Sequence, residues 1–426
     1  MREPRDTVTR RVMALALCAA ACADAPANAQ DDPPEPKPPT YTVAYEARIV
    51  PTEKLAHVTI DLGDPDRAVR EIRFAIDPDR HLGFEGKGEI EIEADKVRWV
   101  PPKGGGKLRY DFRIDHLRDE RSYDARISDA WTIFRGDDLV PPARVRTIKG
   151  AESRATVRLR LPDGWRTVAP YEKSDDGSYV IDHPDRRFDR PVGWFAAGDL
   201  GVLRETVADT KVAIGAPKNQ DFRRQDLLAL LRWTLPTLRA TFPNLPERLA
   251  IVGAGDPMWR GGLSGPRSLY VYADRPAISE DGTSPLLHEL VHTALGARSG
   301  PGGDWVVEGL AELYSLRILQ RSGTMSERRY ERALERLAKK ARKAGSLRAD
   351  SAGSAEAAKG ALLLLELDET LTKETEGATN LDDVARELAE RREPVTTESF
   401  REVAEQTSSV NLERFFSRRE LAPPSE

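Results

Sequence analysis

The sequence contains little cysteine, no long apolar run and no strong excess of charge of either sign. Its two cysteines, Cys18 and Cys22, both lie near the amino terminus, which excludes a folded core held together by disulfides. No apolar stretch approaches the roughly 20 residues that a membrane-spanning helix needs. Lys and Arg number 65 against 70 Asp and Glu, so the net charge of −5 gives no reason to expect a nucleic-acid partner. We expect a globular chain without a transmembrane segment in its mature form.

The amino terminus has the layout of a secretory signal peptide. Basic residues precede an apolar stretch from Val12 to Ala23, and an Ala-Asn-Ala triplet ending at Ala29 has the small side chains of a cleavage site. We assign residues 1–29 to this signal and expect a periplasmic or secreted protein. Two variants stay open: a lipoprotein with its lipid on Cys22, and a twin-arginine signal at Arg10-Arg11. The remaining alternative is a disordered amino-terminal tail without a targeting role.

The next 170 residues change character twice, which indicates a linker and then a domain. Residues 30–40 are acidic and rich in proline, a composition that resists compaction and suits a linker. Residues 41–200 show short runs of alternating apolar and polar residues, separated by Gly, Pro and Asp. This pattern predicts a β-sandwich domain. The histidines at positions 57, 81, 116 and 183 share no spacing, and we interpret them as structural or surface residues.

From residue 201 the apolar spacing becomes mainly helical, which predicts an α+β protein. Residues 222–242 have helical spacing that Pro236 interrupts. The segments 249–252 and 268–272 are strand candidates between the helices. We assign residues 201–345 to a second domain that carries the functional site.

The carboxy-terminal region, residues 346–426, consists of charged amphipathic helices that we expect to complete the second domain. Its helix caps are predicted at Asn380, Thr396 and Asn411. The basic run at 339–343, just before this region, is interleaved with glutamates upstream, so we interpret it as a solvated helix face.

One helix carries a metal-binding pattern. Ser284 is a suitable N-cap, Pro285 fits the first helical position, and Gly296 marks the end. Within this helix, His288 and His292 lie four residues apart, so they project from one face and can share a metal ion.

Carboxylates stand beside and beyond the two histidines. Glu289 lies on the adjoining face, where it can reach a metal-bound water without binding the metal. The following helix supplies Glu308 as third ligand, with Asp304 as its cap and Gly309 allowing close approach to the histidine helix. Glu312, one turn later, is predicted to accept the free ring N–H of a histidine. The alternative for both late glutamates is a solvated helix face.

These residues resemble the gluzincin metallopeptidases, in which H-E-x-x-H is followed by a W-x-x-E-G helix. Within that group the chain is most similar to the glycyl aminopeptidase family. The similarity rests on a Gly-Gly-Leu segment at 261–263, a Lys-Gly helix at 359–368, a Leu-Asp-Asp-Val stretch at 381–384 and a closing Phe-Phe at 415–416. The resemblance implies a thermolysin-like, mainly helical catalytic domain after the β-sandwich. The PDZ-like domain often found in the family is not expected here.

The resemblance also implies a zinc-dependent peptidase with Zn²⁺ as cofactor and a peptide as substrate. His288, His292 and Glu308 would bind the ion, and Glu289 would act as general base toward the attacking water. Glu312 would orient a histidine. The oligomeric state is left open.

Substrate contacts are implied at Gly262, Leu263 and Ser268, with an extended peptide pairing along residues 268–272. Two family features are replaced. The Gly-Gly-Leu segment continues as Ser264-Gly265 in place of Glu-His, which removes the carboxylate that anchors a substrate amine. Ala357 stands where the family has the tyrosine that stabilises the oxyanion.

The replaced tyrosine leaves two hypotheses about activity. Tyr270, Tyr272, Tyr314 and Arg267 are candidates to donate the missing hydrogen bond. With such a donor the chain is an exported zinc peptidase. Without one it is a catalytically weak, metal-retaining homologue that binds peptides or proteins.

Overall fold

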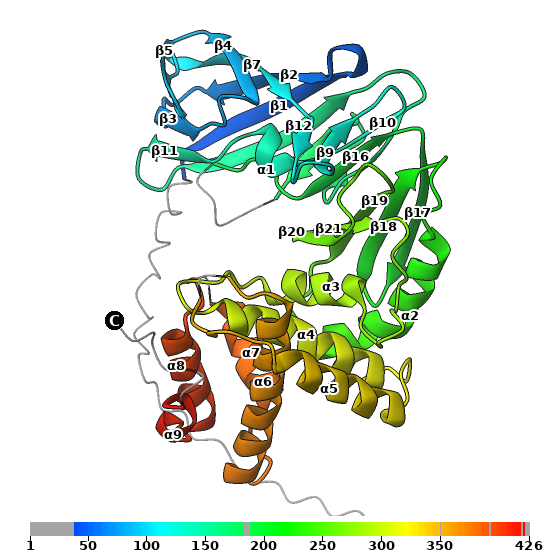
Figure 1. Cartoon of the computed structure of the whole chain (residues 1–426). Helices are drawn as coiled ribbons and strands as arrows, with labels where there is room; N and C mark the ends of the chain where they lie inside the picture. Colours follow the sequence, from blue (N-terminus) through cyan, green and yellow to red (C-terminus); the bar gives the residue numbers. More distant parts are fainter. Residues whose placement is uncertain (1–37, 183–187, 350, 392, 419–420, 422–426) are drawn as a thin grey trace, which may run out of the picture. The chain divides into compact units, whose positions relative to one another are not determined.

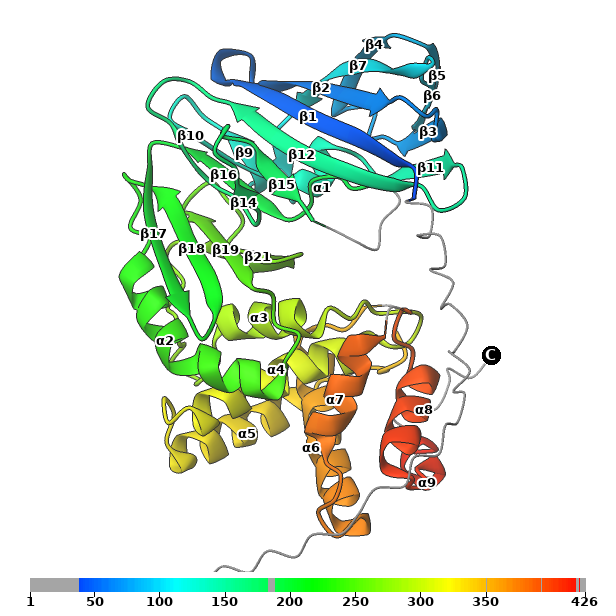
Figure 2. The same cartoon turned by 180° about the vertical axis from the view of Figure 1, so that it is seen from behind.

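The computed structural model describes residues 38–182, 188–349, 351–391, 393–418 and 421. The predicted signal peptide, Cys22, most of the predicted linker and His183 lie outside these residues. Along the described chain, strands come first and helices dominate later (Figures 1 and 2). This is the mixed α+β class that the sequence predicts.

The strands up to residue 198 form three sheets. In β1 (Thr40–Val50) every second side chain from Tyr41 to Ile49 is buried, because alternate residues of a strand face one side of the sheet. β1 pairs in parallel with β12 (Glu152–Arg160) and antiparallel with β2 (Leu55–Asp64). All three sheets contribute to one apolar core, so this part is more elaborate than the two-sheet sandwich that the alternation suggests.

The remaining strands of this part belong to the three sheets as follows. The seven-stranded sheet, ordered β14-β15-β12-β1-β2-β7-β4, also contains β14 (Glu172–Lys173), β15 (Tyr179–Ile181), β7 (Gly104–Arg113) and β4 (His81–Gly86). The five-stranded sheet contains, in order, β13 (Arg166–Val168), β16 (Trp194–Gly198), β10 (Trp131–Arg135), β9 (Tyr123–Ile127) and β8 (His116–Leu117). The four-stranded sheet contains β11 (Ala143–Thr147), β3 (Val69–Ala75), β6 (Lys96–Val100) and β5 (Glu89–Glu93). Two single-turn helices are η1 (Pro51–Glu53) and α1 (Gly136–Leu139).

A further five-stranded sheet opens the second part of the chain. Its order is β17 (Leu200–Val207), β18 (Thr210–Pro217), β19 (Arg248–Ala254), β21 (Ser268–Tyr272) and β20 (Gly262–Gly265). β18, β19 and β21 are parallel to one another, and the two edge strands, β17 and β20, are antiparallel to their neighbours. The two strands predicted here from the sequence are therefore β19 and β21.

Helices make up most of the rest of the chain, and they share one large apolar core with the sheet that contains β17 to β21. They are α2 (Arg224–Thr241), α3 (Pro285–Leu295), α4 (Asp304–Arg321), α5 (Glu327–Ala341), α6 (Ser354–Glu374), α7 (Leu381–Glu390), α8 (Thr397–Ser408) and α9 (Glu413–Phe416). Pro236 lies inside α2 and does not interrupt it, contrary to the sequence-based expectation. Asn380 and Thr396 cap α7 and α8 as predicted. Among the helices that the structure describes, none combines the length and apolarity required to cross a bilayer.

The two parts of the chain meet in a separate apolar cluster between β16 and the sheet that contains β17 to β21. The rings of Trp194 and Tyr270 lie 5.4 Å apart, and the backbone N–H of Trp194 donates a 2.8 Å hydrogen bond to the Ser268 hydroxyl. Because both aromatic side chains are fully buried, this cluster fixes the sheet that borders the site.

Two glycines bring α4 and α6 into backbone contact. A Cβ on Gly309 would lie 2.8 Å from the backbone carbon of Gly360, and a Cβ on Gly360 would lie 2.5 Å from the carbonyl oxygen of Trp305. The prediction that Gly309 faces the histidine helix is wrong, because its open side faces α6. The contact nevertheless fixes the helix that carries Glu308.

Replacing Gly360 with alanine is expected to destabilise the protein by about 1–3 kcal/mol, because α4 and α6 must separate to admit the methyl group. Chemical denaturation measures the change. Gly345→Ala is the matched control, since a Cβ there meets only the flexible Glu356 side chain, at 3.5 Å. Equal stability of the two variants would show that the close contact is not required.

Candidate metal centre and active site

The ends of α3 are defined by the residues that the sequence suggests. The Ser284 hydroxyl accepts a 3.3 Å hydrogen bond from the backbone N–H of Leu287, and Pro285 occupies the first turn. Gly296 follows the helix with a φ of 62°, and its N–H donates to the carbonyl of His292. These caps set the rotation of the helix and hence the direction of its histidines.

The start of α4 is held by its neighbours and not by a cap. The Trp305 ring N–H donates to the Thr397 hydroxyl at 2.9 Å, and that hydroxyl donates to the carbonyl of Gly302 at 2.6 Å. Asp304 is not the N-cap as predicted, because Gly303 occupies that position. The Asp304 carboxylate instead accepts the backbone N–H of Ala352 at 2.7 Å. The buried Trp305 and the partly exposed Asp304 thus anchor the turn before Glu308.

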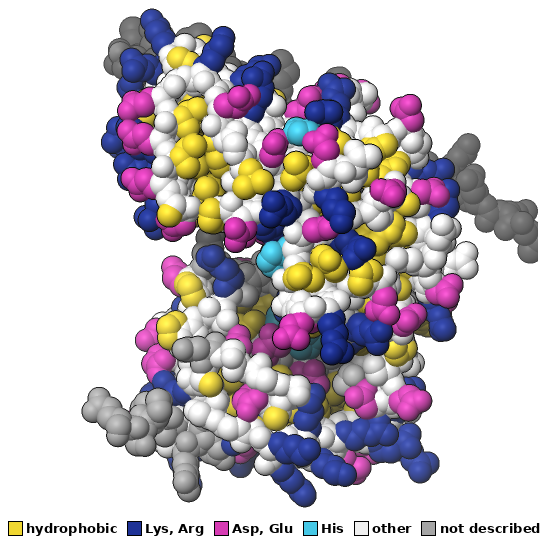
Figure 3. Space-filling model, turned by 45° about the horizontal axis from the view of Figure 1, so that its top comes forward, with side chains coloured by type: hydrophobic (Ala, Val, Ile, Leu, Met, Phe, Trp, Pro, Cys, Tyr) yellow, Lys and Arg dark blue, Asp and Glu magenta, His cyan; other side chains and the backbone are white. Residues whose placement is uncertain are grey.

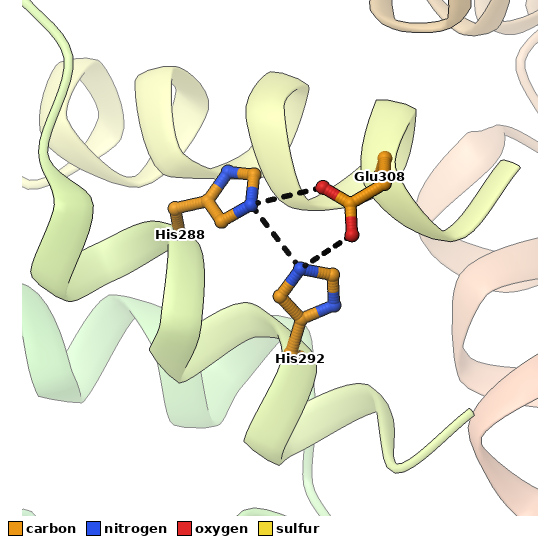
Figure 4. A group of neighbouring side chains, drawn as sticks. All are labelled: His288, His292 and Glu308. Atoms are coloured by element: carbon orange, nitrogen blue, oxygen red, sulfur yellow. Dashed lines mark hydrogen bonds and ion pairs between the residues drawn. The ribbon is translucent and has the colours of Figure 1, made fainter. Parts of the chain in front are cut away.

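His288, His292 and Glu308 converge between α3 and α4 (Figure 4). The two histidine Nε2 atoms lie 3.2 Å apart. One Glu308 oxygen lies 3.3 Å from Nε2 of His288, and the other lies 3.4 Å from Nε2 of His292. The three side chains therefore form a triangle in which each oxygen of Glu308 faces one of the two histidines.

This donor set fits zinc in both chemistry and size. Two imidazole nitrogens and one carboxylate oxygen are a ligand combination of catalytic zinc sites. Ligands about 2.0–2.1 Å from a tetrahedral ion stand roughly 3.3 Å from one another. The 3.2 Å between the two Nε2 atoms matches this value, and each Nε2 has one oxygen of Glu308 at a similar distance, 3.3 or 3.4 Å. Three protein ligands also leave a fourth coordination position.

Glu312 lies behind the triangle, on the side of His288 away from the other ligands. Its carboxylate oxygen is 3.4 Å from Nδ1 of His288, and its side chain is largely buried. A proton held at Nδ1 by this carboxylate leaves Nε2 with a free electron pair. The structure thus places Glu312 where the sequence-based hypothesis needs it.

The pKa values of His288 and Glu308 are shifted in opposite directions, as expected for a positively charged histidine beside a buried carboxylate. Burial lowers the pKa of His288, but the hydrogen bonds to Glu308 and Glu312 and the charge of Glu289 outweigh it and raise the pKa to about 10. Burial raises the pKa of Glu308, yet the contacts with His288 and His292 hold it well below its usual range. Without a metal, a protonated His288 compensates the buried carboxylate.

Glu289 lies opposite the edge strand. A Cβ on Gly262, in β20, would stand 3.1 Å from the Glu289 Cγ and 3.5 Å from a carboxylate oxygen. Among the described residues, the Glu289 carboxylate forms no ion pair. It can therefore accept a hydrogen bond from a molecule between α3 and β20.

The comparisons with known proteins support the fold. No sequence-family model matches the chain, and no curated protein matches it in sequence. Among solved structures, an aminopeptidase N family protein from Idiomarina loihiensis has a TM-score of 0.66 at 15% identity, covering 88% of this chain and 75% of that one. The M1 zinc metallopeptidase of Deinococcus radiodurans has a TM-score of 0.61 at 15% identity, covering 91% and 94%.

A glutamate-to-alanine variant of that Deinococcus radiodurans enzyme, bound to a Tyr-Ser-Ala substrate, has a TM-score of 0.58 at 15% identity and covers 91% and 95%. The chain has the M1 metallopeptidase fold. This supports the predicted gluzincin architecture at the level of the fold, whereas the finer resemblance to the glycyl aminopeptidase family stays a prediction.

In this M1 fold, β20 and not β21 is the edge strand. β21 is bonded to β19 on one side and to β20 on the other, so the prediction that a peptide pairs along residues 268–272 is wrong. Ser268 is fully buried, and its hydroxyl donates to the carbonyl of Pro266 and accepts the N–H of Trp194. The Ser268 hydroxyl therefore stabilises the fold and is not exposed to a substrate. Gly262 and Leu263 lie on the edge strand, as a substrate contact requires.

The four candidate oxyanion donors are all occupied elsewhere. Tyr270 donates to the carbonyl of Trp259, and Tyr272 donates to Asp256. Tyr314 donates to Asp382, and Arg267 binds Asp182. The expectation that one of them replaces the missing tyrosine therefore lacks support from their hydrogen bonds.

A pocket next to the metal ligands contains residues that the sequence did not single out. It has a volume of about 290 Å³, and its lining includes Trp259, Arg275, Arg336 and Lys340 beside His288 and Glu289. Lys340 belongs to the basic run that the sequence indicates as a solvated helix face, and it is exposed as well as lining this pocket. A signal was present, because Lys340 follows buried Ala333 and Leu337 by seven and three residues, the spacing of one helix face.

Zinc binding is expected to release about one proton at pH 7, because zinc requires a neutral imidazole and His288 is protonated in the metal-free protein. The affinity should therefore rise about tenfold per pH unit between pH 6 and 9. Calorimetric titration in two buffers of different ionisation enthalpy counts the protons. A pH-independent affinity without proton release would contradict the electrostatics described above.

Proposed function

We propose that this chain is an exported zinc-dependent peptidase. The observation that carries the proposal is the convergence of His288, His292 and Glu308 into a zinc-sized triangle, with the unpaired Glu289 carboxylate facing an edge strand. The solved structures of similar fold from Deinococcus radiodurans, which are named M1 zinc metallopeptidases, support the same chemistry. Export rests on the signal-peptide layout of residues 1–29.

Zinc at this site would lower the pKa of a coordinated water and polarise the scissile carbonyl. The residues of the chain supply the rest. β20 offers backbone groups to an extended peptide, as sheet edges do in strand addition. Glu289 takes the proton of the attacking water and passes it to the leaving nitrogen. Glu312 keeps the proton of His288 on Nδ1, so that Nε2 faces the ion.

Two features support an endopeptidase activity better than an aminopeptidase activity. β20 reads Gly262-Leu263-Ser264-Gly265, so it carries no carboxylate to bind a free amine. In addition, no step of the proposed mechanism requires a free amino terminus on the substrate.

A second candidate function is a metal-retaining homologue that binds peptides and hydrolyses them weakly. It is favoured by the occupied hydrogen bonds of Tyr270, Tyr272, Tyr314 and Arg267, and by the absence of tyrosine after Tyr330 in the sequence. Loss of one oxyanion donor typically costs about 10²–10³ in rate.

An assay of purified protein with quenched peptide libraries separates the two functions. The peptidase predicts cleavage that chelation abolishes and added zinc restores. One bound zinc per chain without any such cleavage would favour the binding function and overturn the peptidase. Absence of zinc binding would overturn both.

A further inference from the structure

The pocket beside the metal ligands is lined by different side chains from different elements. Helices α3 and α4 contribute His288, Glu289 and Glu312. Helix α5 contributes Arg336 and Lys340, and the segment before α3 contributes Arg275. Any ligand in it therefore lies within reach of the reacting groups.

The α5 side of the pocket is mainly basic. Arg275, Arg336 and Lys340 line the pocket, and among the described residues none of the three has a carboxylate within ion-pair distance. Asp281 lines it too; burial raises its pKa, but hydrogen bonds from the N–H and hydroxyl of Thr283 and the charges of Arg336 and Lys340 lower it below its usual value. Figure 3 shows Lys and Arg side chains beside the hollow in which histidine and acidic side chains lie.

One wall of the pocket is rigid and apolar. The Trp259 ring covers Gly261, where a Cβ would lie 1.8 Å from a ring carbon. The guanidinium of Arg118, from the first part of the chain, stacks on the same ring at 4.2 Å, and the backbone N–H of Trp259 donates to the carbonyl of Tyr123 at 2.8 Å. Both the ring and the backbone of Trp259 are thus fixed in position.

We propose that this pocket is a subsite for a carboxylate of the substrate, provided either by an acidic side chain next to the cleaved bond or by the carboxy terminus of a short peptide. The substrate carboxylate meets Arg275 and Lys340 on the side of the pocket away from the metal ligands. This inference rests on the proposed function, since it names the substrate class of the same site. A pocket of about 290 Å³ is at the small end of ligand sites, which suits one side chain.

The first test compares kcat/KM for quenched peptides in which glutamate replaces glutamine at one position at a time, each with a free or an amidated carboxy terminus. Exposed charges act on a ligand by about two- to fivefold each. We expect at least a fivefold preference for glutamate at one position, or for the free terminus. Equal cleavage of all peptides would overturn the proposal.

Charge-reversed variants assign the preference to the pocket. Lys340→Glu and Arg275→Glu are each expected to lower it about tenfold. Lys339→Glu and Arg332→Glu, exposed neighbours on α5 that do not line the pocket, are expected to keep it. Arg336 is left intact, because its guanidinium also donates to the carbonyl of Glu280. Equal losses in pocket and control variants would overturn the assignment.

A binding measurement keeps this inference separate from the peptidase function. Calorimetric titration of a Glu289→Gln variant with uncleaved peptides reports the carboxylate preference without turnover. Preferential binding combined with no cleavage by the wild type would support the subsite and overturn the peptidase. Cleavage without any preference in either measurement would overturn the subsite and leave the peptidase standing.

Discussion

Replacing Glu289 with glutamine is expected to lower kcat/KM for peptide hydrolysis by about 10²–10⁴-fold, because the amide cannot take up the proton that the attacking water loses. The side chain keeps its size, so its packing beside Gly262 should persist. Zinc content should remain that of the wild type, since Glu289 does not belong to the ligand triangle. Steady-state kinetics and metal analysis of the same preparation check both statements.

The control for this substitution is Glu335→Gln, which removes an exposed carboxylate of α5 outside the pocket. Its kcat/KM should equal that of the wild type. If Glu289→Gln retained full activity with zinc bound, Glu289 would not be the general base, and the assigned mechanism would be wrong.

Replacing Glu308 with alanine is expected to weaken zinc binding by more than about 10²-fold. Loss of an outer-shell partner alone costs roughly 10–100-fold, and Glu308 is positioned to bind the ion directly. The substitution also leaves His288 and His292 without the carboxylate that contacts both rings. Competition with a chromophoric chelator measures the affinity.

Glu308→His is the matched variant, because zinc accepts three imidazoles as readily as two imidazoles and a carboxylate. It should bind zinc more tightly than Glu308→Ala. Similar affinities for Glu308→Ala and the wild type would place the metal elsewhere in the chain.

The parts of the site that could be predicted from the sequence are those set by a single helix. Ser284 and Gly296 fix the ends of α3, and a spacing of four residues then places His288 and His292 on one face. The position of Glu308 needed one further assumption, that the next helix packs against the first. Trp305, three residues before it, indicates such packing, because a large apolar side chain at the start of a helix is usually buried.

The parts that could not be predicted depend on partners distant in the chain. Gly309 allows a close helix contact, but only the fold shows that the partner is Gly360 of α6. Asp304 has the residue type of a cap, yet a backbone N–H 48 residues away takes its carboxylate. A local sequence pattern shows which kind of interaction a residue can make. The tertiary packing determines which partner it makes the interaction with.

The same limit applies to the substrate side. Residues 268–272 have a clear strand pattern, but a pattern does not show whether a strand is central or at the edge of its sheet. The buried Ser268 and the open β20 follow from the order of the strands. Likewise, the tyrosines of β21 are present in the sequence, and their hydrogen bonds to Trp259 and Asp256 emerge only in the folded chain.

The most direct test of the zinc site is a crystal structure of the zinc-loaded protein with anomalous data collected at the zinc edge. We predict one strong peak about 2.0–2.2 Å from Nε2 of His288, Nε2 of His292 and a carboxylate oxygen of Glu308. Glu289 should lie outside bonding distance of the peak. A peak at other residues, or none between α3 and α4, would contradict the account.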